Sequence, residues 1–308
     1  MLQVARLAPK ILGADATALV AHFLRSKQNA DGGFPDREGR SDLYYTVFAL
    51  DALTALQQPF EEERVRKFAA SFGEGASLDF VHLCALVRCW SALERRSPTR
   101  PGPHRDERAG SETGAPPASA LLSRLAAFRA RDGGFHPAPD SARGTAYGAF
   151  LGVAAYQDLG ADLPQPLELV RSLKFLETTD GAWTNEIFGR GPMPVGATNS
   201  TAAAVTVLRQ LNMPVNAAVG DWLLAQAHPQ GGFLAVPGAP IPDLLSTATA
   251  LHALSGLQIS FDKIKEPCLD FVDTLWTNEG GFHGHWADDH LDAEYTCYGL
   301  LALGHLSL

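Results

Sequence analysis

Cysteine, net positive charge and long apolar runs are what this chain has least of, and each shortage excludes a class of protein. The four cysteines form no C-x-x-C pair, so we expect reduced thiols in the cytoplasm rather than a disulfide framework. Acidic residues outnumber lysine and arginine by 34 to 25, a balance that disfavours nucleic acid as a partner. No uncharged apolar run reaches the roughly 18 residues that a membrane span needs, and the first residues lack the apolar segment of a secretory signal.

What the chain does have is a unit that recurs six times: an apolar helix, a Gly-rich turn and a second apolar helix. Four turns are clear, with Gly-Gly-Phe at 32–34, 133–135, 231–233 and 280–282. Weaker versions stand at 72–75 and 180–183. A unit of this kind cannot bury its apolar face alone, so neighbouring units must stack. Six stacked units can close into a ring around a central cavity.

Helical periodicity divides each unit into an outer and an inner helix. The outer helices are predicted over 16–28, 61–72, 120–129, 167–177, 215–227 and 266–277. The inner helices, apolar on nearly all sides and therefore buried, are predicted over 42–56, 78–93, 144–159, 199–211, 244–257 and 293–306. We predict an all-α fold, an α/α toroid of six outer and six inner helices that forms a single domain over 1–308. A segment rich in Pro, Gly and charge at 95–119 is predicted to be a disordered loop.

The order of the elements places the N-termini of all six inner helices at one rim of the cavity. Helix N-termini carry partial positive charge and favour an anion. Asp42, Asp79 and Asp243 stand at such starts. We weigh helix capping at roughly two to one over a catalytic role for each of them.

Aromatic residues gather in the first turns of the predicted inner helices. They are Tyr44, Tyr45, Phe48, Phe80, Tyr147, Phe150, Tyr295 and Tyr298. Core packing is the default explanation for any one of them, whereas several together are suited to line a tunnel for an apolar chain. We take the five tyrosines Tyr44, Tyr45, Tyr147, Tyr295 and Tyr298 as candidate substrate-binding residues.

The last two units resemble the prenyltransferase and squalene-oxidase repeat family, and within it the β subunits of protein prenyltransferases. The segment 280–282 (GGF) followed by 292–299 (DAEYTCYG) is similar to the family's Gly-Gly turn and D-x-x-H-T-x-x-G motif. The segment 231–233 (GGF) followed by 243–246 (DLLS) is similar to its Gly-Gly turn and D-x-C-Y motif. The resemblance spans nearly the whole chain. It implies an α/α toroid that binds an isoprenoid in its cavity and works beside a helical partner subunit, or else self-associates.

The resemblance stops at the family's zinc site. Zinc in the β subunits is held by the Asp and Cys of D-x-C and by the His of D-x-x-H-T. Asp243 is present here, but Leu245 replaces the Cys and Tyr295 replaces the His. Zinc needs three or four N, S or O donors, so we predict that the family zinc site is lost. Asp243 and Asp292 remain as candidate catalytic carboxylates at the rim.

The cations that bind diphosphate in the family are mostly missing as well. The segment 234–242 between the fifth Gly-Gly turn and Asp243 contains none. Arg143 and Arg190 are the candidates that remain for the anionic end of a ligand, since Arg suits phosphate oxygens. Ordinary exposed loop positions are the alternative for both.

The sixth turn is dense in metal-ligand residue types. Its segment 288–292 reads D-D-x-x-D, which binds magnesium in class I terpene synthases but there lies on a helix facing the cavity. A divalent metal held by His285, His290 and Asp288 or Asp289 is a minority hypothesis, at roughly one in five, against a solvated loop.

Together these observations predict a prenyltransferase β-like toroid that binds an isoprenoid or isoprenoid diphosphate and, as an enzyme, acts without the family zinc. Three alternatives stay open. The first is a binding or interaction protein that kept the fold and lost the chemistry. The second resembles class II terpene cyclases, with Asp42, Asp79 or Asp292 as the acid, although their D-x-D-D motif is absent. The third is a glycan-active toroid with Asp42 and Asp292 facing each other across a cleft.

Overall fold

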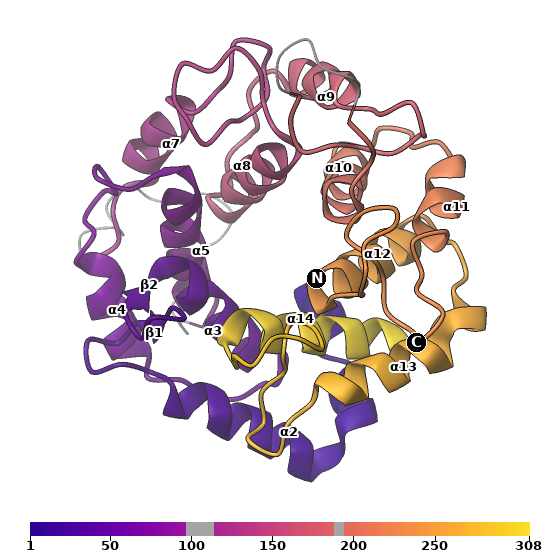
Figure 1. The fold of residues 1–308 in the computed structure, drawn as a ribbon. Coiled ribbons are helices and arrows are strands. Elements are labelled where there is room, and N and C mark those ends of the chain that lie inside the picture. The colour runs from indigo at the N-terminus through magenta and orange to yellow at the C-terminus, as the bar shows by residue number, and fades with distance from the viewer. Residues whose placement is uncertain (97–113, 188–193) are drawn as a thin grey trace.

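The computed structural model describes residues 1–96, 114–187 and 194–308. Most of the predicted loop at 95–119, and the candidate Arg190, therefore lie outside the described residues. The helix α5 (Phe80–Arg96) ends within the predicted loop, and α7 (Ala118–Ala126) begins within it. Over the described ranges the helices form a ring that is plain when viewed down its axis (Figure 1).

Six helices of the described part form the inner wall of the ring. They are α3 (Leu43–Ala55), α5, α8 (Ala146–Asp158), α10 (Thr198–Gln210), α12 (Leu244–Gly256) and α14 (Ala293–Leu306). Each packs against the next, and α14 packs against α3, so the wall closes (Figure 1). Ala and Leu are the commonest residues of these helices and favour the helical state. Their side chains are buried on most sides.

The outer wall consists of the helices that precede the Gly-rich turns. They are α2 (Pro9–Ser26), α4 (Glu62–Ala70), α7, α9 (Pro166–Phe175), α11 (Ala218–Leu224) and α13 (Asp262–Leu275). This arrangement confirms the predicted α/α toroid. No helix in the described ranges is long and apolar enough to cross a bilayer.

The Gly-Gly turns join each unit to the outer helix of the next. A Cβ atom on Gly231 would lie 1.8 Å from the carbonyl oxygen of Pro267 in α13. A Cβ on Gly280 would lie 2.5 Å from the carbonyl oxygen of Leu19 in α2. Both glycines also have positive φ, at 91° and 93°, where residues with a Cβ are strained. The sixth turn therefore docks on the first outer helix and closes the outer wall.

A threonine near the start of several inner helices ties each turn to the inner wall. The Phe34 amide donates to Thr46 Oγ1 at 2.9 Å, and the Phe233 amide donates to Thr247 Oγ1 at the same distance. In the first unit the short strands β1 (Phe34–Pro35) and β2 (Ser41–Asp42) pair antiparallel above this contact. The phenylalanines of the four Gly-Gly-Phe turns are fully buried between the walls. The threonine hydrogen bond and the buried phenylalanine thus hold the Gly-rich turns in place at the rim.

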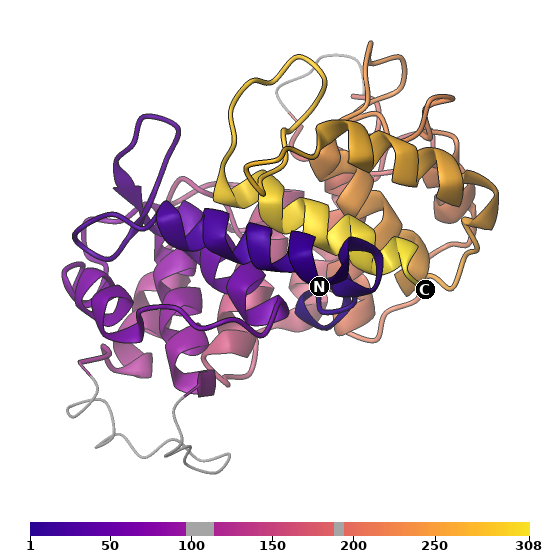
Figure 2. The same cartoon turned by 90° about the horizontal axis from the view of Figure 1, so that it is seen from below.

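The N-terminal segment adds an element that the periodicity did not predict. The short helix α1 (Leu2–Ala5) packs against α3 and α14. A Cβ on Gly304, near the end of α14, would lie 2.1 Å from the carbonyl oxygen of Val4. The segment therefore lies where the inner helices end, opposite the rim. In the edge-on view the β1–β2 hairpin and the loop leading into α14 rise together on one side of the ring (Figure 2).

Candidate functional site

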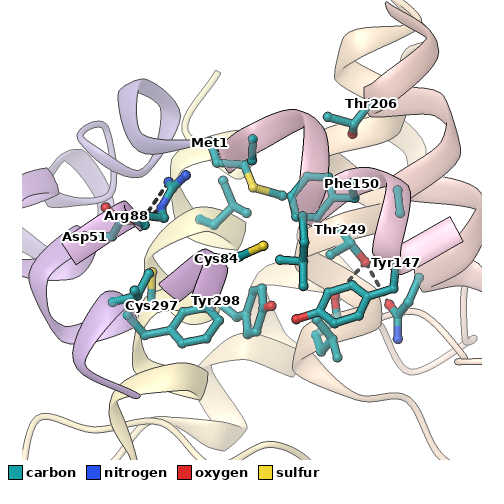
Figure 3. A pocket seen from close by; sticks show the side chains of 18 of the residues that line it. Met1, Asp51, Cys84, Arg88, Tyr147, Phe150, Thr206, Thr249, Cys297 and Tyr298 are labelled. Atoms are coloured by element: carbon teal, nitrogen blue, oxygen red, sulfur yellow. Dashed lines mark hydrogen bonds and ion pairs between the residues drawn. The ribbon is translucent and has the colours of Figure 1, made fainter. Parts of the chain in front are cut away.

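The inner helices enclose a central cavity of about 470 Å³. Its middle is apolar and includes small and aromatic side chains from five of the six inner helices (Figure 3). We call this apolar middle part of the cavity the waist. It is lined by Val47, Phe48, Val81, Cys84, Ala85, Phe150, Leu151, Ala154, Ala202, Ala203 and Leu301. The cavity has polar residues at both ends. One end lies beside α1. The other lies at the rim formed by the N-termini of the inner helices, and we call this end the mouth.

The end beside α1 contains charges that neutralise one another. Met1, Leu2 and Ala5 line it. Arg88 lies 2.8 Å from Asp51 and 3.5 Å from Asp158, each distance joining a guanidinium nitrogen to a carboxylate oxygen. Asp51 raises the pKa of Arg88, so the guanidinium stays charged. Each of these residues is a single charge on an otherwise apolar inner-helix face.

Two histidines complete this end, the half-buried His252 and the buried His305. His252 Nδ1 and His305 Nε2 lie 3.0 Å apart. Burial lowers the pKa of His252 to about 3 and that of His305 to about 4, so both are neutral near pH 7. His305 Nδ1 is buried and has no partner in the described part of the chain.

The mouth is built around three tyrosines and a glutamate. Tyr44, Tyr147 and Tyr298 line the cavity. The Tyr44 hydroxyl donates to Glu294 Oε1 at 2.6 Å. Burial raises the pKa of Glu294 to about 7, although the Tyr44 hydrogen bond works in the opposite direction. Near pH 7 this carboxyl group therefore exchanges readily between its protonated and charged forms, one hydrogen bond away from the cavity wall.

The sequence reasoning missed Glu294, although a signal was available. An acidic residue in the first turn of a helix is normally explained by the helix dipole. Glu294, however, stands four residues before the predicted lining residue Tyr298, and side chains at that spacing share a helix face. Asp51, Arg88 and Asp158 were missed in the same way, since isolated charges on apolar inner helices point to the lumen or to a buried pair.

Two side-chain amides add hydrogen-bond donors to the mouth. Asn199 Oδ1 accepts from the Thr249 hydroxyl at 2.9 Å, and Asn185 Oδ1 accepts from the Tyr147 amide at 3.0 Å. The Tyr147 amide can only donate, so it fixes the oxygen of Asn185, and with the Thr249 hydroxyl as donor the same holds for Asn199. The two Nδ2 groups have no partner within the described ranges, and both residues line the cavity.

The structure separates the five predicted tyrosines into two groups. Tyr44, Tyr147 and Tyr298 line the cavity, whereas Tyr45 and Tyr295 are absent from its wall. Tyr295 instead lies under the guanidinium of Arg37, which is 5.3 Å from the ring centre. Successive helix residues point about 100° apart, so Tyr45 points in a different direction from Tyr44.

The two carboxylates predicted as catalytic are helix caps. Asp243 accepts from the Ser246 amide and from the Ser246 hydroxyl, each at 2.7 Å. Asp292 accepts from the Tyr295 amide at 2.8 Å and from Arg37 Nε at 3.0 Å. Burial raises the pKa of both aspartates, and at Asp292 the Arg37 charge opposes the rise. Capping is thus shown for each, and a catalytic role stays a prediction.

A third aspartate cap belongs to a charged cluster on the rim. His82 Nε2 lies 2.9 Å from Asp42, and its Nδ1 lies 2.9 Å from Asp79. The hydrogen bond to Asp42 raises the pKa of His82 to about 9, so this imidazole is charged at neutral pH. Against the raising effect of burial, hydrogen bonds from His82 lower the pKa of both aspartates. Asp42 and Asp79 are therefore ill suited to donate a proton.

Of the two candidate anion-binding arginines, the structure describes Arg143 alone. Arg143 is exposed and lies over the Phe175 ring at 3.4 Å from its centre, away from the cavity wall. Arg190 lies outside the described residues. The proposed pairing of these two arginines around an anion stays a prediction.

The residues at the family's zinc positions do not fit a zinc ion. Leu245 lines the cavity and has no donor atom. Burial raises the pKa of Tyr295 to about 12, so its phenol keeps the proton that a metal would displace. Both Asp243 oxygens already accept hydrogen bonds from Ser246. This donor set cannot complete the tetrahedral site that zinc requires.

The sixth turn brings together part of the predicted metal cluster. Ligand atoms of Asp288, Asp289 and His290 lie within 4.8 Å of one another, and His285 is not part of this group. Asp288 is also 2.9 Å from Arg37. A metal there would have to compete with the guanidinium for this carboxylate, and the metal site stays a prediction.

Comparisons with known proteins give a consistent picture of the fold. The sequence profile of the prenyltransferase alpha-alpha toroid domain matches residues 4–93 and 197–307. No curated protein sequence matches the chain. Among solved structures, Candida albicans protein geranylgeranyltransferase-I complexed with GGPP is 13% identical with a TM-score of 0.62, over 99% of this chain and 89% of that one.

Two further structures show how widely the fold is shared. A variant of the type II terpene cyclase MstE from Scytonema, in complex with geranylgeranyl dihydroxybenzoate, is 11% identical with a TM-score of 0.60, over 99% of this chain and 97% of that one. A polysaccharide lyase is 10% identical with a TM-score of 0.55, over 95% of this chain and 98% of that one. At these identities the likeness concerns the fold alone.

Proposed function

This chain belongs to the prenyltransferase alpha-alpha toroid family, and from that premise we propose that its central cavity binds an isoprenoid chain. The observation that carries the proposal is the apolar waist at the centre of the ring. A volume of about 470 Å³ falls within the roughly 300–1,000 Å³ of typical small-molecule sites. Aromatic and aliphatic walls gain free energy when they exclude water by contact with a hydrocarbon.

The solved relatives support an isoprenoid over other apolar ligands. The geranylgeranyltransferase is complexed with GGPP, and the cyclase variant is complexed with a geranylgeranyl compound. The polysaccharide lyase has the same fold, but an apolar waist offers few hydrogen-bond partners to a sugar. We therefore place the glycan-active alternative behind the isoprenoid one.

As an enzyme, the protein would act on the isoprenoid without the family zinc, since the residues at those positions do not fit the ion. Glu294 favours one second candidate, a proton-initiated rearrangement like that of class II cyclases. Its pKa of about 7 leaves a proton available near neutral pH. That proton is one hydrogen bond from Tyr44, which lines the cavity. A binding protein without turnover is the alternative.

Partners and location extend the same proposal. On the family resemblance we expect a helical subunit or a second copy of this chain to associate with the toroid in the cytoplasm. Light scattering on the purified protein distinguishes a monomer from a dimer.

The proposal is tested by filling the waist. Ala203 faces the cavity on α10, so Ala203→Phe should remove volume where the chain would lie. We expect the unaltered protein to form a one-to-one complex with geranylgeraniol, with geranylgeranyl diphosphate, or with both, in native mass spectrometry and calorimetry. Ala203→Phe should weaken that binding at least tenfold. Ala126→Phe, on the exposed face of α7, is the matched control and should bind normally.

Two results would count against the proposal: no complex with either ligand, or equal binding by the Ala203→Phe protein. The same samples also report on chemistry. A product isomeric with geranylgeraniol that forms with the unaltered protein and not with Glu294→Gln would support the proton-initiated reaction. An intact ligand in every sample would support the binding protein.

A further inference from the structure

We propose that the isoprenoid bound by this chain has an uncharged, hydroxyl-bearing head group, held at the mouth by the side-chain amides of Asn185 and Asn199, and not a diphosphate. The inference rests on the proposed function and names its ligand class. Two observations carry it: carboxylates pair the cationic side chains Arg88, Arg37 and His82, and neutral donors at the mouth remain without partners in the described ranges.

The lysine and arginine side chains of the cavity wall offer no uncompensated cation in the described ranges. Arg88 is the one lysine or arginine that lines the cavity there. Two carboxylates, Asp51 and Asp158, already contact it. It also lies at the α1 end, across the apolar waist from the mouth. An anion at Arg88 would have to displace an existing ion pair after crossing that waist.

The cations beside the mouth are also compensated. Arg37 contacts both Asp288 and Asp292, at 2.9 and 3.0 Å. His82 contacts both Asp42 and Asp79, at 2.9 Å each. Each positive charge is therefore matched by two negative ones.

Glu294 and Asp243 add carboxyl groups whose side-chain hydrogen bonds in the described part of the chain come from neutral groups, those of Tyr44 and Ser246. Burial raises the pKa of each, as expected where negative charge is poorly accommodated. A diphosphate carries two to three negative charges and would enter this same environment. Like charges at short range repel, and the repulsion is strongest where water is excluded.

The donors that remain are neutral and point to an oxygen acceptor. Asn185 and Asn199 each use the side-chain oxygen within the protein, which leaves the Nδ2 groups without partners in the described ranges. Ser200, mostly buried, lines the cavity beside Asn199 and its hydroxyl also has no described partner. Amide and hydroxyl donors of this kind suit a hydroxyl oxygen. Sites built on such bonds discriminate against ligands that cannot make them.

Geometry decides which end of the ligand lies here. Asn199 is in the first turn of α10 and Asn185 is in the fourth Gly-rich turn, so both belong to the rim. Below them the wall becomes apolar at Phe150, Ala154 and Ala203. The hydroxyl end therefore lies at the mouth and the hydrocarbon runs along the waist toward α1.

Calorimetry with two matched ligands tests the inference. Geranylgeraniol and geranylgeranyl diphosphate share one hydrocarbon and differ only in the head group. We expect geranylgeraniol to bind at least tenfold more tightly, with and without Mg²⁺. Asn199→Asp keeps the acceptor for Thr249 and removes the two N–H donors, so it should weaken geranylgeraniol about tenfold. Asn199→Ala should do the same, and Asn278→Ala, an exposed asparagine of the sixth turn, is the control.

The outcomes separate the two proposals. Tighter binding of the diphosphate, with an affinity that falls as salt is added, would overturn the uncharged head group and leave the isoprenoid cavity intact. Unchanged geranylgeraniol affinity in both Asn199 variants would overturn the role of the amides. Binding of neither ligand would instead contradict the proposed function itself.

Discussion

The two ends of the cavity are both polar, yet they are built in opposite ways. At the α1 end Arg88 is surrounded by Asp51 and Asp158, and His252 is bonded to His305. At the mouth Asn185 and Asn199 have donors without described partners, and the nearby carboxyl of Glu294 takes its hydrogen bond from a neutral phenol.

The difference indicates what each end is for. Buried charges that satisfy one another are retained where they fix the packing, and removing one partner is costly. Polar groups left without partners lose free energy unless a ligand or water satisfies them. We therefore assign the α1 end to the stability of the ring and the mouth to recognition.

Removing the cation at the α1 end should have the largest effect on stability. Arg88→Met leaves Asp51 without its ion-pair partner and leaves Asp158 paired with Arg95 alone. We expect the free energy of unfolding to fall by about 3 kcal/mol, at the low end for a broken buried pair because the Arg88 side chain is 30% exposed. Urea denaturation followed by circular dichroism measures this.

Arg95 provides the matched control at the same end. It also contacts Asp158, at 3.3 Å, but its side chain is 38% exposed and lies outside the cavity wall. Arg95→Met should cost no more than about 1 kcal/mol, as is usual for exposed pairs. Equal losses in the two variants would show that the Arg88 cluster does not stabilise the ring in the way we infer.

Glu294 at the mouth should make stability depend on pH. Its pKa rises from 4.5 in the unfolded chain to about 7 in the fold. The folded protein therefore holds the proton more tightly than the unfolded chain does. The stability that this proton contributes is fully present below pH 4.5 and is lost as pH rises through 7. Glu294→Gln should become more stable than the unaltered protein over this interval, by on the order of 2 kcal/mol above pH 7.

Melting temperatures measured from pH 4.5 to 8.5 check this prediction, and Tyr44→Phe sharpens it. The Tyr44 hydroxyl stabilises the carboxylate, so its loss should move the midpoint of the pH dependence upward. A constant difference between Glu294→Gln and the unaltered protein across this range would show that Glu294 titrates normally.

Arg143 should have the smallest effect. It is exposed over the Phe175 ring, an arrangement usually worth about 0.5–1 kcal/mol. Arg143→Ala should lower the free energy of unfolding by about that much and leave the affinity for geranylgeraniol within twofold. A tenfold loss of affinity in calorimetry would restore this arginine to the ligand site.

The sequence predicted the ring and its turns because both depend on local patterns. The Gly-Gly pairs are required where a Cβ would collide with a neighbouring helix, as at Gly231 and Gly280. The apolar period that gave the helices also ended them within a few residues of their observed bounds. Among the described elements, the prediction missed α1, β1, β2 and the start of α2 before its kink at Gly13, since segments of two to four residues are too short to show a period.

The cavity lining was harder to predict, for a physical reason. Inner helices are apolar all round, so hydrophobicity does not reveal which side faces the lumen. Tyr44 and Tyr45 are equivalent in pattern, yet only Tyr44 lines the cavity. Glu294 and the partnerless amides depend on contacts between units far apart in sequence, such as Tyr44 with Glu294. No periodicity within one helix encodes such a contact.

The most direct test of the account is the crystal structure of the protein with geranylgeraniol bound. We predict hydrocarbon density along the waist past Phe150 and Ala203, with the hydroxyl within hydrogen-bond distance of Asn199 Nδ2. An empty waist, with the ligand on the outer wall or absent from crystals grown at saturating concentration, would contradict the claim that this toroid binds an isoprenoid at its centre.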